Sequence, residues 1–169
     1  MAQHKAHSLT GRITSSLMLK AFKAVKKNRG AHGIDKVSIT MFERQRDQNL
    51  AALMKDLKRG NYWPLPLRRK YISKAPGKLR PLGIPAVRDR VAQEVIRQLI
   101  EPYFEPHFAN RSFGFRPRRN CHQAVCELLR LRKLGYRIVL DADIQSFFDN
   151  IPHALIMTDL VKSVLGPVV

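Results

Sequence analysis

Residues 139–151 constrain the fold of this chain more than any other segment, because a short apolar run there leads directly into acidic residues and an aromatic pair. Asp141 and Asp143 follow the apolar residues, and no Lys or Arg occurs between Arg137 and Lys162. An apolar strand that ends in carboxylates suits Mg²⁺, which proteins bind through one or two carboxylates together with substrate phosphates. Two such ions hold the attacking and leaving oxygens in phosphoryl transfer, with further carboxylates from elsewhere in the chain. The segment therefore indicates part of an enzyme.

The rest of the chain is strongly basic. Its 169 residues contain 31 Lys and Arg against 13 Asp and Glu, a formal net charge of +18. Such an excess is typical of proteins whose partner is a polyanion, most often nucleic acid. A hydrophobic fraction of 44% is enough for a folded core, and the length suits one domain, or one domain and part of another.

The two cysteines favour a reducing compartment. Cys121 and Cys126 lie five residues apart, without a Cys-x-x-Cys motif or a Cys/His cluster, so neither a disulfide framework nor a structural zinc site is expected. The first residues lack the apolar core of a secretory signal, and no apolar run approaches the length of a membrane span. We expect a cytoplasmic protein without a membrane partner.

The hydrophobic pattern predicts a chain of mixed helix and strand. Helices are expected over 15–27, from a Thr40/Glu43 capping box to Gly60, over 91–101 before Pro102, from an Asn120/Gln123 capping box to Gly135, and from Pro152 to Gly166. Residues 67–84 are expected to form a β-hairpin, because Pro76 and Gly77 suit the second and third positions of a type II turn. Residues 136–143 are expected to form a buried strand.

The predicted hairpin lies in the most basic stretch of the chain. Between Met54 and Arg90 there are 11 Lys and Arg against two Asp, with aromatic residues interleaved. Basic residues neutralise phosphates, and aromatic rings stack on bases or sugars. The residues predicted to bind nucleic acid include three adjacent cations, Arg68, Arg69 and Lys70, and also Arg116 in a later segment.

Alternation along the hairpin brings further cations together. Residues of equal parity share a face of a two-stranded ribbon, so Lys74, Lys78 and Arg80 are predicted to converge on one phosphate-rich ligand. The alternative is a solvated, charged edge that only discourages aggregation. The length and single sign of the run favour a functional surface.

Residues 112–119 form a second basic segment, which contains a glycine and opens a helix. Helix N-termini attract phosphates through their free N–H groups. The alternative is a packing loop. Both interpretations are compatible if Phe113 and Phe115 are buried while Arg116 is exposed to a ligand.

These segments together resemble the reverse transcriptases encoded by group II introns. The matching stretches are residues 71–85 with 87–91, residues 112–117, residues 141–151, and Gly33-Ile34-Asp35 ahead of them. They occur in the family's order and with suitable gaps, and the resemblance covers residues 30–165.

The resemblance implies roles for individual residues. Asp143 matches the first catalytic aspartate, which binds both Mg²⁺ ions in the complete enzyme, and the carbonyl of Ile144 would assist with one of them. Phe148 matches the aromatic gate that excludes a 2′-hydroxyl on the incoming nucleotide. Lys74 and Arg80 match the residues that hold its triphosphate.

Three further residues are weaker matches. The resemblance would place Arg116 near the template or nucleotide, whereas Asp141 and Asp149 would support the site. Residues 118–121 depart from the family, which more often has a small residue there, so template contacts at this point are not carried over.

The resemblance also implies an architecture, the α+β right-hand fold of reverse transcriptases. Residues 1–29 would form an N-terminal helical extension and residues 30–135 the fingers region, with the basic hairpin at 67–84. Residues 136–169 would begin the palm. The family's Tyr-Ala-Asp-Asp motif does not occur in the sequence, and the thumb is expected to be absent. We therefore expect an N-terminal fragment that is catalytically incomplete alone.

The expected partners of the parent enzyme are an RNA template, intron RNA, a DNA primer and deoxynucleoside triphosphates. One alternative is a reverse transcriptase of CRISPR-associated, retron or diversity-generating type. Another, from a different class, is a non-catalytic RNA-binding module. The apolar strand predicted at 136–143 would lack a neighbour, so self-association through it is also expected.

Overall fold

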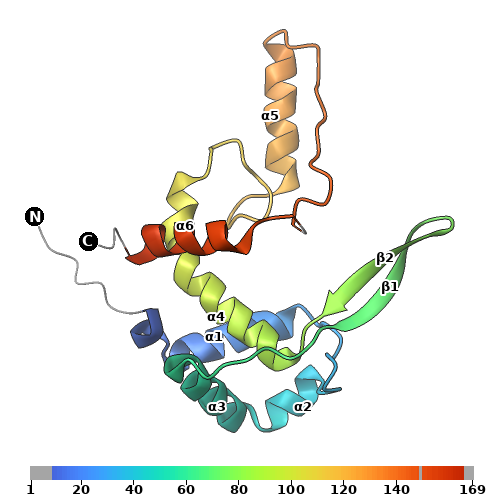
Figure 1. Cartoon of the computed structure of the whole chain (residues 1–169). Helices are drawn as coiled ribbons and strands as arrows, with labels where there is room; N and C mark the ends of the chain where they lie inside the picture. Colours follow the sequence, from blue (N-terminus) through green and yellow to red (C-terminus); the bar gives the residue numbers. More distant parts are fainter. Residues whose placement is uncertain (1–8, 149, 166–169) are drawn as a thin grey trace, which may run out of the picture. The chain divides into compact units, whose positions relative to one another are not determined.

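The computed structural model describes residues 9–148 and 150–165, without the side chains of Lys74, Ala75, Lys78 and residues 162–165. The chain divides into two compact units, Met1–Ile100 and Glu101–Val169. Figure 1 shows the ribbon, and each unit is described by itself.

The first unit is built on helices. A short 3₁₀ helix, η1 (Leu9–Arg12), precedes α1 (Ser15–Lys27), α2 (Ile39–Arg44), α3 (Arg46–Arg59) and the first part of α4 (Val87–Phe104). Their apolar faces form one core, with Met18, Phe22, Leu53, Val91 and Val95 among its most buried members. Burial of each such side chain contributes about 1.5–3 kcal/mol.

The predicted boundaries of α1 are confirmed, because local signals fix both of its ends. The hydroxyl oxygen of Thr14 accepts a hydrogen bond from the Leu17 N–H at 3.2 Å and so caps the first turn. Asn28 ends the helix, as expected from the Asn28-Arg29-Gly30 stop. The end of α3 at Gly60 is confirmed as well, where φ is +73°.

The helix predicted from Thr40 to Gly60 is in fact two helices. The Ser38 hydroxyl caps α2 by accepting from the Met41 N–H at 3.1 Å, and the chain breaks at Gln45. The predicted Thr40/Glu43 capping box is therefore wrong. Glu43 instead pairs with Lys26 on α1, 2.5 Å away.

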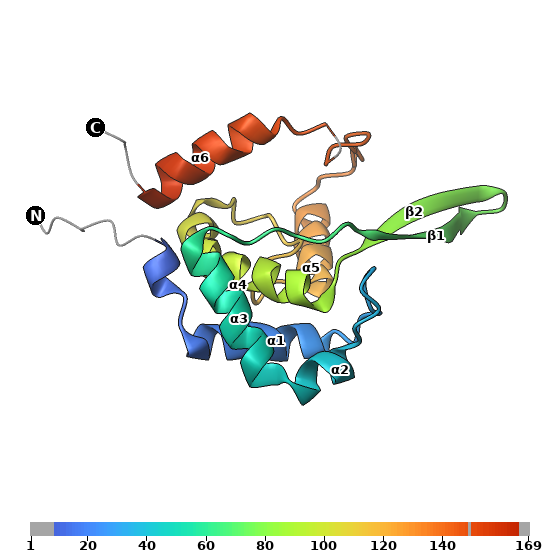
Figure 2. The ribbon, with the colours of Figure 1, turned by 60° about the horizontal axis from the view of Figure 1, so that its bottom comes forward.

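The β-hairpin is confirmed. Strands β1 (Arg68–Ala75) and β2 (Lys78–Ile84) pair antiparallel, and Gly77 has φ +72°, the positive value that the third position of a type II turn requires. Figures 1 and 2 show the hairpin projecting away from the helices of its own unit. Its cations are therefore presented on an extended arm.

Helix α4 is longer than predicted at both ends. It begins at Val87, and the N–H of Arg90 already donates to the Ala86 carbonyl at 3.0 Å. Pro102 lies inside its last turn rather than ending it. A proline there removes only one backbone hydrogen bond, so the helix continues to Phe104.

The second unit carries η2 (Glu105–His107), α5 (Cys121–Lys133) and α6 (His153–Leu165). The Asn120/Gln123 capping box is confirmed, since each side chain bonds the other residue's N–H at 3.0 Å. None of the described residues from 101 to 161 is buried. The apolar face of α5 is exposed accordingly, with Leu128 56% and Leu129 52% accessible.

The prediction of a buried strand at 136–143 is wrong for this structure. These residues have no regular structure, and Ile138 and Leu140 are 93% and 89% exposed. A strand needs a neighbour to receive its N–H and C=O groups. In the described part of the chain, the only sheet is the β1–β2 pair. The described part of the chain is therefore mixed α and β with a single small sheet. The predicted end of α6 at Gly166 lies outside the described residues.

Candidate functional site

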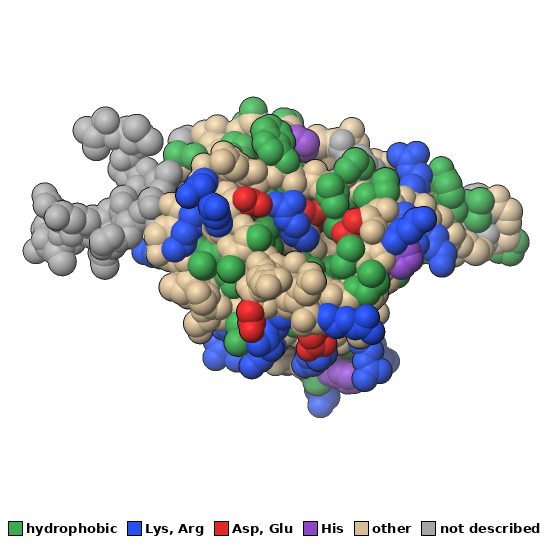
Figure 3. Space-filling model, turned by 90° about the horizontal axis from the view of Figure 1, so that it is seen from below, with side chains coloured by type: hydrophobic (Ala, Val, Ile, Leu, Met, Phe, Trp, Pro, Cys, Tyr) green, Lys and Arg blue, Asp and Glu red, His purple; other side chains and the backbone are tan. Residues whose placement is uncertain are grey.

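The hairpin has two chemically different faces. The cross-strand pairs Arg68↔Ile84, Lys70↔Leu82 and Ile72↔Arg80 put their members on one face, and Arg69↔Gly83, Tyr71↔Pro81 and Ser73↔Leu79 on the other. Arg68, Lys70 and Arg80 therefore share one cationic face, whereas Arg69 points to the opposite side. Figure 3 shows Lys and Arg side chains in blue beside hydrophobic ones in green around the hairpin, at the right of the view.

The cations toward the middle of the hairpin are available to a ligand. Lys70 and Arg80 are exposed, and no ion pair joins Arg69, Lys70 or Arg80 to another residue in the described part of the chain. Because no counterion from the described residues holds them, these side chains can neutralise phosphates without first breaking such an ion pair. Tyr71 is exposed on the opposite face, together with Arg69. An exposed cation beside an exposed aromatic ring is typical of a nucleic-acid surface.

Arg68 differs from its neighbours because it is half-buried. Its Nη1 lies 3.4 Å from Nε2 of His32, and Nδ1 of His32 lies 2.9 Å from the Gly33 carbonyl oxygen. The contact joins the base of the hairpin to the loop before α2. Arg68 thus contributes to attachment of the hairpin, and its predicted contact with nucleic acid stays a prediction.

The predicted convergence of Lys74, Lys78 and Arg80 is not tested. The side chains of Lys74 and Lys78 lie outside the described part of the structure. The register changes from Ser73↔Leu79 to Ala75↔Lys78, which makes Lys74 an extra residue in β1. Simple parity along the strand therefore does not fix the face that Lys74 occupies.

A buried carboxylate lies beside the entry to the hairpin, and the sequence analysis missed it. Asp89 is 1% exposed. It accepts hydrogen bonds from the Tyr62 hydroxyl at 2.7 Å and from the Leu65 N–H at 3.0 Å. Burial, followed by the hydrogen bond to Asp89, raises the pKa of Tyr62 above its ordinary value. The available signal was an aspartate on the apolar face of α4, between Val87 and Val91.

The Gly33-Ile34-Asp35 segment packs closely against the start of α4. A Cβ atom on Gly33 would lie 2.5 Å from the Ala86 Cα, so only glycine allows this approach. The guanidinium of Arg90 donates to the Ala31 carbonyl at 2.5 Å. The segment therefore braces the same end of α4 that holds Asp89.

Arg116 is placed differently from the prediction that it is exposed to a ligand. Its side chain is 8% exposed, and Nη2 lies 2.8 Å from Glu105 Oε1. Its Nη1 also donates to the carbonyls of Ala109, at 2.7 Å, and Ser112, at 3.1 Å. The guanidinium is used to close its own loop because five donors in a fixed fork suit several acceptors at once. Phe115, predicted to be buried, is fully exposed.

The described carboxylates of the acidic segment are exposed to solvent. Asp141, Asp143 and Ile144 are exposed, and Oδ1 of Asp143 accepts from the Ile144 N–H at 3.0 Å. Phe148 is 85% exposed and lies edge-to-face against Phe147, with ring centroids 5.4 Å apart. Asp149 lies outside the described residues.

The described residues do not form a magnesium site by themselves. No group of three His, Cys, Asp or Glu side chains that could hold a metal ion occurs among them. Asp143 supplies one carboxylate, which is fewer than two ions in phosphoryl transfer need. The predicted roles of Asp143 and Ile144 as metal ligands therefore stay predictions.

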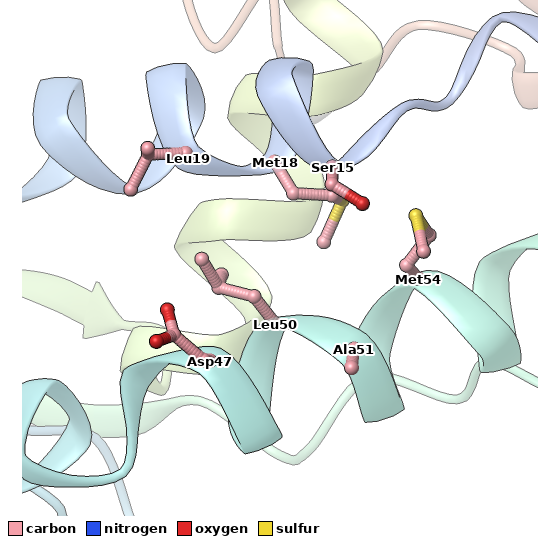
Figure 4. Close-up of a pocket in the computed structure, with 7 residues that line it drawn as sticks. All are labelled: Ser15, Met18, Leu19, Asp47, Leu50, Ala51 and Met54. Carbon is pink, nitrogen blue, oxygen red and sulfur yellow. The ribbon is translucent and has the colours of Figure 1, made fainter.

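A shallow apolar pocket lies between α1 and α3 (Figure 4). It has a volume of about 280 Å³ and is lined mainly by Met18, Leu19, Leu50 and Met54. Its one ionised side chain, Asp47, is already paired with Arg46 at 2.8 Å. The pocket is a packing gap without reactive groups, and it is separate from the hairpin.

Comparison with known proteins decides the family. The family model described as "Reverse transcriptase (RNA-dependent DNA polymerase)" matches residues 72–166, more than half of the chain. The chain belongs to the reverse transcriptase family. The match includes most of the hairpin and the segment around Asp143 and Phe148, two of the regions that carried the resemblance.

Relatives point to the intron-encoded branch of this reverse transcriptase family. Protein YkfC of Escherichia coli is 41% identical over 83% of this chain and 38% of its own length. The group II intron-encoded protein LtrA of Lactococcus lactis is 39% identical over 66% of the chain and 18% of its own length. Nuclear intron maturase 1 of Arabidopsis thaliana is 36% identical over 47% of the chain and 11% of its own length. The resemblance to group II intron reverse transcriptases is confirmed, and the other reverse transcriptase types are not favoured.

The chain spans less than two fifths of the length of these relatives. Among the described residues, no helix is both long and apolar enough to cross a bilayer.

Proposed function

We propose that this chain supplies the fingers region and the first palm segment of an RNA-directed DNA polymerase of group II intron type. The reaction is magnesium-dependent transfer of a deoxynucleotide to a DNA primer, directed by an RNA template. Binding of intron RNA, to assist splicing, is proposed for the complete protein. The observation that carries the proposal is the reverse transcriptase match over residues 72–166.

In this proposal the hairpin is the phosphate-binding arm. Lys74 and Arg80 hold the triphosphate of the incoming nucleotide, and Arg68, Arg69 and Lys70 contact nucleic acid. These contacts with phosphate are supported by the absence of ion pairs at Arg69, Lys70 and Arg80 within the described residues. Guanidinium groups bind phosphate through paired N–H donors, which favours Arg80 as an orienting contact.

The palm segment contributes Asp143 as a carboxylate and Phe148 as the gate against ribonucleotides. We propose the same functional boundaries as the resemblance implies, with residues 1–29 as an extension, 30–135 as fingers and 136–169 as the start of the palm. The proposed location is the cytoplasm. Because a magnesium site needs carboxylates beyond those that the described residues bring together, we expect no catalysis by these 169 residues alone.

Two assays on the purified chain test this function. Fluorescence anisotropy with single-stranded RNA should show binding that weakens steeply with salt. Primer extension should show no product, whereas a protein extended by the remaining length of an intron-encoded relative should extend the primer and lose this activity on Asp143→Ala. Extension that survives Asp143→Ala would contradict the assignment of this carboxylate.

The gate is tested in the same extended protein. Phe148→Ala should keep DNA synthesis and admit ribonucleotides, because removing the ring leaves space for the 2′-hydroxyl. Phe147→Ala, which changes the adjacent ring, is the matched control. Unchanged sugar discrimination in Phe148→Ala would show that the gate lies elsewhere.

A non-catalytic RNA-binding module is the second candidate. It is favoured by one observation, the contrast between unpaired hairpin cations and carboxylates that do not cluster in the described residues. RNA binding with no polymerase activity in the extended protein would select this candidate.

A further inference from the structure

Asp89 is an unusual residue for the position it occupies. It is the one charged side chain among the buried residues that the structure describes, at 1% exposure. It lies in the first turn of α4 between Val87 and Val91, which are both fully buried. Removing a carboxylate from water costs several kcal/mol unless donors replace the lost hydration.

Both carboxylate oxygens of Asp89 are used, and by donors from a single segment. Oδ1 accepts from the Tyr62 hydroxyl at 2.7 Å, and Oδ2 accepts from the Leu65 N–H at 3.0 Å. Arg88 lies over the Tyr62 ring, 5.2 Å from its centroid, and pairs with Asp56 of α3 at 2.7 Å. The Tyr62 ring is thus held against both α3 and α4.

Apart from the Tyr62 ring, which also packs against the core, the segment that Asp89 holds has no regular structure to fix it. Residues 61–67 form neither helix nor strand. Pro64 and Pro66 have no N–H to donate. The Leu65 N–H lies between these prolines, and it is this group that Asp89 captures.

The hairpin begins immediately after this segment. Strand β1 starts at Arg68, three residues after Leu65. Its eight residues extend roughly 26 Å at about 3.3 Å per residue. A rotation of about 10° at the base therefore moves the tip by roughly 5 Å over that length, which is enough to remove a phosphate contact.

We propose that Asp89 is a positioning residue that holds Tyr62 and Leu65 and so sets the direction in which the hairpin presents Lys70 and Arg80 to phosphate. The link to phosphate rests on the proposed function. The proposed effect on the direction of the hairpin does not rest on that function, because it depends on the two hydrogen bonds of Asp89. The contact between Arg68 and His32 is a second attachment at the base of the hairpin. The β1–β2 pairing does not include Asp89, so we expect the hairpin to stay folded when Asp89 is changed.

The direction of the hairpin is measurable without RNA. One spin label is placed at Leu79→Cys on β2 and another at Ala52→Cys on α3, both exposed positions within the first unit. The background carries Cys121→Ser and Cys126→Ser, because both native cysteines are exposed. The distance distribution between the labels then reports how the hairpin is held relative to the helices.

We expect a single narrow distribution in the parent and a broadened or shifted one in Asp89→Ala, with the helical circular dichroism retained. Tyr62→Phe, which removes one of the two bonds, should broaden the distribution less. Asp56→Ala is the matched control, since it removes the ion pair to Arg88 but leaves both hydrogen bonds of Asp89. An unchanged distribution in Asp89→Ala overturns the proposal. If Asp89→Ala does not fold, an unchanged distribution in Tyr62→Phe overturns it.

RNA affinity measured on the same variants separates the two claims. A severalfold loss in Asp89→Ala, together with the changed distance, supports the proposal in full. A changed distance with unaltered RNA affinity overturns the link between hairpin direction and phosphate. If the parent itself does not bind RNA, the proposed function fails, while the distances still decide whether Asp89 positions the hairpin.

Discussion

At the scale of single residues, the same chemical group occurs in two different environments in this chain. The guanidinium of Arg80 is exposed on the hairpin, whereas that of Arg116 is 8% exposed and fully occupied by one loop. Carbonyl and carboxylate oxygens lie within hydrogen-bond distance of the Arg116 guanidinium, whereas no ion pair joins Arg80 to another described residue. An arginine is available to a ligand only where the chain offers it no acceptors of its own.

Titration of Tyr62 provides a test at this scale. Burial and the hydrogen bond to Asp89 raise its pKa above the ordinary value of 10.0. The folded protein then gains stability that is complete below that ordinary value and lost as the pH rises through the pKa of the folded state. Phenolate absorbance should show a late phase that disappears in Tyr62→Phe and moves to lower pH in Asp89→Asn. A late phase that persists in Tyr62→Phe would assign it to another tyrosine.

Replacing Arg116 tests the assignment of that residue to its loop. Arg116→Ala removes the donor to the Ala109 and Ser112 carbonyls and the Glu105 carboxylate. These acceptors are exposed or half-buried, so water can replace the arginine, and we expect a loss of only about 0.5–1.5 kcal/mol. We expect faster hydrogen exchange over 105–119 and an almost unchanged salt dependence of RNA binding. Arg118→Ala, at an exposed neighbour, is the control. A clearly smaller salt slope in Arg116→Ala would restore the prediction that Arg116 binds nucleic acid.

At the scale of helices and strands, the elements that the sequence predicts well are those specified by local signals. Helix α1 is bounded by Thr14 and Asn28, and the hairpin by the Pro76-Gly77 turn. Each of these signals acts within a few residues of the element it controls. The strand predicted at 136–143 failed because its hydrogen bonds must come from a distant segment, which apolar composition does not supply.

The candidate site likewise has features that the local sequence pattern predicts and features that depend on distant residues. The cationic face of the hairpin follows from alternation, which requires only the strand period. The contact of Asp89 with Tyr62 spans 27 positions, and nothing in the local pattern reveals it. The bulge at Lys74 was missed for the same reason, because register depends on both strands.

Gly33→Ala tests the contact between the loop at 30–35 and α4. The added Cβ would meet the Ala86 backbone at 2.5 Å, and backbone atoms cannot turn aside as a side chain can. We expect a loss of roughly 1–3 kcal/mol in the free energy of unfolding, measured with urea. Gly114→Ala is the matched control, because nothing lies within 4 Å of its Cβ position. Equal stability of the two variants would contradict the close approach.

At the scale of the whole molecule, charge and exposed apolar surface act in opposite directions. A net charge of +18 keeps molecules apart, whereas Ile138, Val139 and Leu140 are all more than three-quarters exposed and favour association. Because salt screens the repulsion, we propose self-association that increases with ionic strength. Sedimentation velocity should show it, and Ile138→Ser with Leu140→Ser should reduce it. A monomer at every salt concentration would contradict this expectation.

The central claim is that the hairpin of this reverse transcriptase family member neutralises RNA phosphates, and the salt dependence of RNA affinity tests it most directly. The logarithm of the affinity should fall linearly with the logarithm of salt concentration, by about 0.7 per phosphate neutralised on a single strand. Replacing Arg68, Arg69 and Lys70 with glutamine should reduce the slope by roughly two units. The control replaces Arg132, Lys133 and Arg137, which are exposed, and should leave most of the slope unchanged. Equal slopes in the two variants would show that net charge alone, and not the hairpin, binds the RNA.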